Sequence, residues 1–127
     1  MKVTFTILLL FSAAFSISAQ STWKAPSAAK TIKSPLPVSS GDYKEAKKIF
    51  TEMCVICHGN KGKGDGLASA ALTPKPANFS LSTVQSQTNG ELFWKITNGN
   101  PPMAAYKEVL TETQRWQLVA YLRTFKK

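Results

Sequence analysis

Apolar residues between positions 43 and 127 recur at helical spacing in three stretches of the chain. The first stretch has apolar side chains at positions i, i+3, i+4 and i+7, namely Ala46, Ile49, Phe50 and Met53. That period is typical of one buried helical face, so we expect a helix from about Tyr43 to Met53. Asp42 is its predicted N-cap, and Glu45 three residues later completes a capping-box-like pattern.

A second, shorter stretch follows in the C-terminal half. We expect its helix to start at a cap on Asn89 and to stop at Asn98–Gly99. Its apolar face would consist of Leu92, Phe93 and Ile96. Between this helix and the first one, residues 67–72 have room for one or two helical turns. Residues 73–79, with Pro74 and Pro76, are predicted to be a helix-free loop.

The third stretch is the most regular and runs from Leu110 to Phe125. Thr111 is its predicted cap, with Gln114 at the matching position of a capping box. The apolar face consists of Trp116, Leu118, Val119, Leu122 and Phe125. Arg115 and Arg123 fall on the polar side, so we expect the aromatic face to pack on the first helix.

The first 40 residues have a different character. Lys2 and the apolar run of residues 3–15 are followed by small residues, which is typical of an exported protein's signal peptide over residues 1–19. An uncleaved membrane anchor is the alternative. Residues 20–40, with three prolines and no apolar period, are predicted to be an extended or mobile linker. Trp23 is expected to be a loose aromatic in this linker, and its docking on the domain surface is the alternative. The folded domain would be residues 41–127.

Charge and size narrow the function classes. The chain has 127 residues and a formal net charge of +9, which falls to +8 when Lys2 leaves with the signal peptide. The charge favours acidic protein partners. The lysines are scattered and no nucleic-acid-binding motif is present, so a nucleic-acid function is not expected. A domain this small usually needs a covalent cross-link or a bound metal to stabilise its fold.

Cys54-Val55-Ile56-Cys57-His58, or CVICH, holds both cysteines of the chain and its only histidine. C-x-x-C-H is the attachment pattern for c-type haem. Two thiols at this spacing can form thioether bonds to the vinyl groups on one haem edge, and the next residue then lies under the iron as proximal ligand. We therefore predict one covalent haem c held by Cys54, Cys57 and His58.

Three other interpretations of CVICH remain open. A redox dithiol expects a strand and a βαβ unit, and neither is visible in the sequence. A zinc site needs about four ligands, and no Cys or His remains outside the motif. A structural disulfide would usually join distant segments.

Two loops complete the predicted site. Residues 59–66 contain four glycines, which permit left-handed backbone and close approach to a flat cofactor. Lys61 and Lys63 in this loop would lie near the exposed haem edge. A carbonyl of Pro74 or Pro76 is a candidate acceptor for the Nδ1 proton of His58, and a plain surface loop is the alternative.

The sixth iron ligand is predicted by elimination among three methionines. Met1 leaves with the signal peptide. Met53 neighbours Cys54 on the proximal side and cannot reach across the haem. Met103 lies in a loop between two predicted helices, after Pro101 and Pro102, and is therefore the predicted distal ligand; a core-filling methionine is the alternative.

CVICH, the glycine-rich loop, Asn98–Gly99 before Met103 and the helix LTETQRWQLVAYLRTF together resemble a class I monohaem cytochrome c, similar to the haem-c domain of cbb3 oxidase subunits. The resemblance covers about residues 41–127. It implies an all-α cytochrome c fold of about four short helices around one haem, with the first and last helices crossing near Phe50 and Tyr121. It also implies electron transfer without turnover of a substrate.

These expectations describe a periplasmic one-electron carrier with acidic redox partners (a reductase and an oxidase) and no stable membrane insertion unless the N-terminal segment stays uncleaved. Two alternatives are kept. The chain could be a haem-c relay subunit of a respiratory or dehydrogenase complex, which co-purification would reveal. It could also be a gas-binding haem sensor, in which Met103 would be labile.

Overall fold

The computed structural model describes residues 23–35 and 43–127, and the predicted signal peptide and the Asp42 cap lie outside these ranges. In chain order the helical elements are η1 (Ser27–Thr31), α1 (Lys44–Ile49), the π-helical turn η2 (Phe50–Cys54), α2 (Val55–His58), η3 (Ser69–Ala71), α3 (Ser82–Gln85), α4 (Asn89–Asn98) and α5 (Glu112–Arg123). No strand occurs in the described ranges beyond one isolated bridge, Asn100 with Met103. The predicted all-α fold is confirmed.

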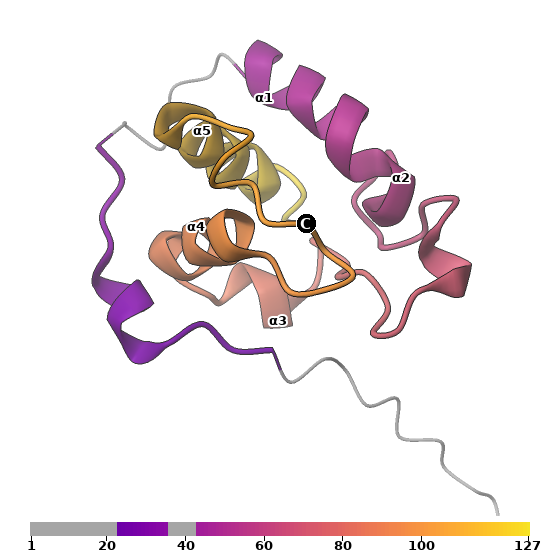
Figure 1. Ribbon diagram of the computed structural model, residues 1–127, viewed down its shortest axis with the longest axis horizontal. Coiled ribbons are helices and arrows are strands. Elements are labelled where there is room, and N and C mark those ends of the chain that lie inside the picture. The colour runs from indigo at the N-terminus through magenta and orange to yellow at the C-terminus, as the bar shows by residue number, and fades with distance from the viewer. Residues whose placement is uncertain (1–22, 36–42) are drawn as a thin grey trace, which may run out of the picture.

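The core forms where α5 packs between α1 and α4 (Figure 1). Its largest fully buried side chains are Phe50, at the start of η2 directly after α1, and Val119 of α5. The rings of Phe50 and Tyr121 meet edge to face with centroids 5.4 Å apart, so the expected crossing of the first and last helices is confirmed. None of the helices in the described ranges is long and apolar enough to cross a membrane.

The first helix differs from the prediction because it contains a π turn. The Val55 N–H donates to the Phe50 carbonyl, five residues back, so this turn holds one residue more than an α-helical turn. The extra residue changes the helical register after Phe50, and Met53 leaves the core face with 36% of its surface exposed, whereas Phe50 is 1% exposed. Cys54 and Val55 pack on the core in its place. The prediction that Met53 belongs to the buried stripe is therefore wrong.

Helix caps agree with the sequence pattern in one case and shift by one residue in another. Thr111 and Gln114 form the predicted capping box of α5. The box of α4 is formed by Thr88 with Glu91, so Asn89 is the first helical residue and not the cap. Gly99, at φ 63°, ends α4 as predicted. Glu45 accepts a hydrogen bond from the Gln114 side chain, which ties α1 to the start of α5.

Residues 23–35 do not form the extended or mobile arm that the prolines suggested. They contain η1, which packs against α4 (Figure 1), and Ala29 is 1% exposed. The Trp23 ring lies 6.4 Å from that of Trp94, and the Lys95 Nζ sits 5.1 Å from the Trp23 centroid. The arm packs on the folded unit through two contacts with α4. The Trp23 ring lies beside the Trp94 ring, and the Lys95 ammonium lies over the Trp23 ring.

Gly90 permits this arm to dock, and its substitution is the first test of the packing. A Cβ on Gly90 would collide with the carbonyl oxygen of Ala29. We expect Gly90→Ala to lower the stability of the whole chain by about 1–3 kcal/mol in thermal unfolding, as overpacking does. In a chain starting at Gly41 the same substitution should be neutral, or stabilising by up to about 1 kcal/mol. An equal loss in both chains would contradict the docked arm.

Candidate functional site

CVICH forms the end of the first helical run. Cys54 closes the π turn and the other four residues make up α2, so the helix continues five residues beyond the predicted end at Met53. The two thiols are free and partly exposed. Burial, and secondarily the Cys57 thiolate, raises the pKa of Cys54 to about 11. A redox dithiol requires a lowered thiol pKa, so this geometry does not favour that interpretation.

His58 is oriented by a backbone carbonyl. Its Nδ1 lies 3.1 Å from the Ala77 carbonyl oxygen, so the tautomer that donates there leaves Nε2 free to bind a metal. The acceptor belongs to neither Pro74 nor Pro76, and that part of the prediction is wrong. The proline-rich loop still supplies it, since Ala77 directly follows Pro76. Burial lowers the pKa of His58 against the opposite effect of the Ala77 hydrogen bond, which favours the neutral, ligating imidazole.

Phe79 supports the His58 ring and was not predicted from the sequence. The two rings stack with centroids 4.5 Å apart at an interplanar angle of 22°. Phe79 in turn lies 6.1 Å from Phe50 and 6.0 Å from Phe125, so the histidine rests on the aromatic cluster that joins the first and last helices. An aromatic residue directly after the proline loop was the available signal, but only the fold shows what it contacts.

The glycine-rich loop folds back against α2. The N–H groups of Gly64, Gly66 and Ala68 donate to the carbonyls of His58, Cys57 and Ile56. A Cβ on Gly66 would collide with the backbone carbonyls of Val55 and Ile56, so this glycine is required for the close approach. The loop therefore satisfies the carbonyls that the helix end leaves open and fixes the direction of CVICH.

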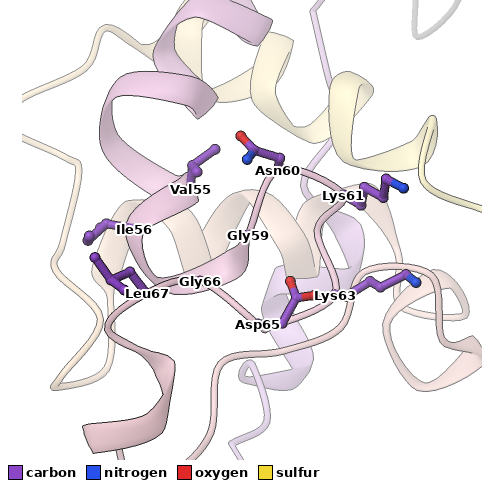
Figure 2. A pocket seen from close by; sticks show the side chains of 9 residues that line it. All are labelled: Val55, Ile56, Gly59, Asn60, Lys61, Lys63, Asp65, Gly66 and Leu67. Atoms are coloured by element: carbon purple, nitrogen blue, oxygen red, sulfur yellow. The ribbon is translucent and has the colours of Figure 1, made fainter.

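A shallow depression of about 530 Å³ separates the outer side of α2 from this loop (Figure 2). Ile56 and Leu67 lie at one end of it, and Lys61 and Lys63 extend from the loop at the other. Leu67 is 90% exposed and Ile56 is 51% exposed. The surface beside CVICH therefore combines exposed apolar side chains with two lysines.

Met103 lies in the loop between α4 and α5. Met103 and Asn100 exchange backbone hydrogen bonds of 2.9 and 3.0 Å, which makes the turn that bears the side chain compact. The loop returns to α4 through Tyr106, whose N–H donates to the Ile96 carbonyl. The Tyr106 hydroxyl donates to the Met53 carbonyl over 3.2 Å. The loop that carries Met103 is thus attached to the residue just before CVICH.

Arg115 and Tyr106 are further residues at this end of the molecule that sequence reasoning missed. Arg115, placed on the polar face by helical period, is 8% exposed. Its guanidinium donates to the Thr97 hydroxyl and lies 5.0 Å from the Phe93 ring centroid. The helical period of α5 could not predict these two contacts, because both partners, Thr97 and Phe93, belong to a different helix, α4.

The chemistry of these residues fits a covalently attached haem. Two free thiols at the C-x-x-C spacing precede a neutral imidazole whose Nδ1 is already engaged, which is the arrangement a proximal haem ligand needs. Within residues 23–35 and 43–127, no group of three or more His, Cys, Asp or Glu side chains could hold a metal ion, so a zinc site gains no support.

Comparison with known proteins gives a family. A sequence model described as "Cytochrome C oxidase, cbb3-type, subunit III" matches residues 41–122. A comparison with curated proteins gives no match. One similar solved structure is a chain of the Kuenenia stuttgartiensis reducing HAO-like protein complex Kustc0457/Kustc0458, with 31% identity and a TM-score of 0.60. That match covers 75% of this chain and 46% of the other, so this chain spans about half of its length.

A second similar structure is the KustC0563 c-type cytochrome, with 28% identity and a TM-score of 0.56, covering 65% of this chain and 98% of that one. A mutant of the same cytochrome aligns equally well, with a TM-score of 0.55. The sequence match spans well over half of the chain, and the structural matches agree with it. The protein therefore belongs to the class I cytochromes c, in the family of subunit III of cbb3-type cytochrome c oxidase, which implies covalently bound haem c.

Proposed function

We propose that this protein is a periplasmic one-electron carrier with one haem c, attached through Cys54 and Cys57 and ligated axially by His58 and Met103. The observation that carries the proposal is the hydrogen bond from His58 Nδ1 to the Ala77 carbonyl beside two free thiols. That bond selects the tautomer a proximal haem ligand uses. Bound haem c supplies a reversible ferric/ferrous couple.

The chain's residues would keep that couple at a fixed geometry. His58 is held by Ala77 on one edge and by Phe79 on its face, so its ring has little freedom to turn. Met103 is carried by a compact, hydrogen-bonded turn. The soft thioether favours ferrous iron and so raises the potential. Ligands that move little between oxidation states keep the reorganisation on electron transfer small.

The proposed export and partners rest on sequence and surface. The signal-peptide pattern of residues 1–19 supports the proposed export from the cytoplasm. Lys61 and Lys63 flank the depression beside CVICH, where they would attract an acidic redox partner (Figure 2). The chain supplies no second histidine as an acid–base group near a haem, so we propose a carrier and not an enzyme.

A relay role in a complex is the alternative that a specific observation favours. One similar structure is a chain of a reducing HAO-like protein complex, and this protein aligns with less than half of that chain. The haem chemistry would be the same and only the partner would differ. Co-purification of the exported protein with a stable partner would support the relay role. A gas sensor would instead require Met103 to leave the iron readily.

An optical spectrum of the exported protein, oxidised and reduced, with and without carbon monoxide, tests the proposal. We expect a reduced c-type spectrum that carbon monoxide does not change and a methionine-to-iron charge-transfer band when oxidised. A prompt shift with carbon monoxide would indicate an open sixth position and the gas-binding alternative. A protein without haem, after expression with the attachment machinery, would contradict the proposal altogether.

Reversing the charge of Lys61 and Lys63 tests the steering of partners. We expect Lys61→Glu with Lys63→Glu to slow electron transfer to an acidic partner by roughly tenfold at low ionic strength, because steering typically raises association rates by one to three orders of magnitude. The difference should fade near 0.1 M salt, where the screening length is about 10 Å. Stopped-flow mixing measures both.

The matched control is Lys30→Glu with Lys33→Glu. These two lysines are also exposed, but they lie in the arm on the far side of α4 from the glycine-rich loop (Figure 1). The same change in net charge should have a much smaller effect there. Equal slowing by both pairs would show that total charge, and not the surface beside CVICH, governs association.

A further inference from the structure

The Tyr106 side chain connects the segment that carries His58 to the loop that carries Met103, the two proposed axial ligands. Its hydroxyl donates to the Met53 carbonyl over 3.2 Å, across 53 residues of sequence. Met53 directly precedes Cys54, and Tyr106 follows Met103 by three residues. Its ring is partly buried and packs against the core. Burial raises the pKa of Tyr106.

The loop of residues 99–105, called here the Met103 loop, has a firm base. Its ends are closed by hydrogen bonds from the N–H groups of Tyr106 and Lys107 to the carbonyls of Ile96 and Thr97. The Thr97 hydroxyl accepts from the buried Arg115 guanidinium over 2.6 Å, so the end of α4 is tied to α5. Motion of Met103 must therefore come from the loop itself and not from the helices that carry it.

Beyond this base, the hydrogen bond of the Tyr106 side chain connects the end of the loop to Met53, the residue directly before CVICH. In Figure 1 the orange segment leaves α4, extends towards the α2 side and returns to α5. The returning end of this loop is held by the Tyr106 side chain, which opposes motion of the loop away from the residues just before CVICH. The hydroxyl of Tyr106 resists that motion because its acceptor is a backbone carbonyl of the π turn, which side-chain motion cannot displace.

We propose that Tyr106 is a positioning residue, whose hydrogen bond to the Met53 carbonyl holds the Met103 loop closed and so sets how readily the sixth ligand leaves the iron. The inference rests on the proposed ligation by His58 and Met103. A neutral hydrogen bond contributes a net stabilisation that corresponds to roughly a three- to tenfold change in an equilibrium constant. Loss of the hydroxyl should therefore raise the population with Met103 off the iron by that factor.

The experiment is an imidazole titration of the oxidised, haem-loaded full-length protein, followed by the methionine-to-iron band. Imidazole binds only the population whose sixth position is open, so its apparent affinity rises with that population. Tyr106→Phe keeps the ring and removes the hydroxyl, and we expect imidazole to bind it roughly three- to tenfold more tightly. Amide hydrogen exchange should accelerate across residues 99–106 and little elsewhere.

The matched control is Tyr121→Phe, which removes the same hydroxyl from a ring packed against Tyr43 and Phe50. It should leave imidazole affinity unchanged. Equal affinity in wild type, Tyr106→Phe and Tyr121→Phe would overturn the inference, as would exchange that accelerates uniformly over the chain. A wild-type protein without the methionine-to-iron band would overturn the proposed ligation itself, and a wild type with the band but an unaffected Tyr106→Phe variant overturns only the role of Tyr106.

Discussion

Met103→Ala is expected to abolish the methionine-to-iron charge-transfer band and to open the iron to carbon monoxide. The reduction potential should fall by on the order of 100 mV or more, within the range of about 0.8 V that axial ligands span. The physical reason is that a thioether stabilises ferrous iron, whereas water or hydroxide in its place does not. Spectra of both oxidation states and a redox titration measure the effect, which should be the largest of any single substitution outside CVICH.

Met53→Ala is the control, because Met53 is the other methionine in the described part of the chain. Its side chain is 36% exposed, since the π turn rotates it off the core. Truncating it should leave the charge-transfer band and the potential close to wild type. If Met103→Ala kept the band, or if Met53→Ala lost it, the assignment of the distal ligand would be wrong.

Cys54→Ser combined with Cys57→Ser should yield a polypeptide with no covalent haem. A serine hydroxyl is nearly the size of the thiol but does not form the thioether bond, so haem could be held only reversibly by the axial ligands. A denaturing gel stained for haem should be blank for this variant. The exported protein should also unfold at a clearly lower temperature, because the small domain loses its staple.

The two single variants serve as controls for that experiment. Each retains one thiol of CVICH and should stay covalently stained, with less haem per chain because one bond must suffice. Haem that survives denaturation in the double variant would show attachment at another residue. Blank lanes for both single variants would show instead that the two bonds form only together.

Much of the fold follows from periodicity and caps. The apolar faces of α4 and α5 appear where the sequence has them, because each is a regular helix whose period is uninterrupted. Thr111 with Gln114 caps α5 as predicted. The cap of α4 is Thr88, one residue before the predicted Asn89. Both side chains can cap a helix, and the position of Glu91, three residues after Thr88, decides between them.

Periodicity fails where the chain departs from the α-helix. The π turn adds one residue before CVICH, and no composition signal marks it, so periodicity places Met53 on the wrong face. The same limit applies to the arm. Prolines predict the lack of a long helix, but they do not show that η1 finds a partner in α4. The helical period places Arg115 on the solvent-exposed face of α5. It is buried instead, because its guanidinium donates to the Thr97 hydroxyl and lies over the Phe93 ring, both on α4.

The sequence by itself determined the chemistry of the candidate site. CVICH has a spacing that suits two thioether bonds and a proximal histidine, and that spacing is local, so it can be read without a fold. Met103 is selected differently, by elimination among the three methionines of the chain, and its ligation stays a prediction.

Only the tertiary structure decided how those residues are held. Three groups distant in the sequence contact the segment 53–58. The Ala77 carbonyl and the Phe79 ring contact His58, and the Tyr106 hydroxyl contacts Met53, at separations of 19 to 53 residues. Contacts of that kind depend on the path of the intervening loops, and many residues of the same type would satisfy the sequence pattern equally well. The predicted haem-binding residues of CVICH are thus specified locally, whereas the orientation of the His58 ring and the position of the Met103 loop are set by packing.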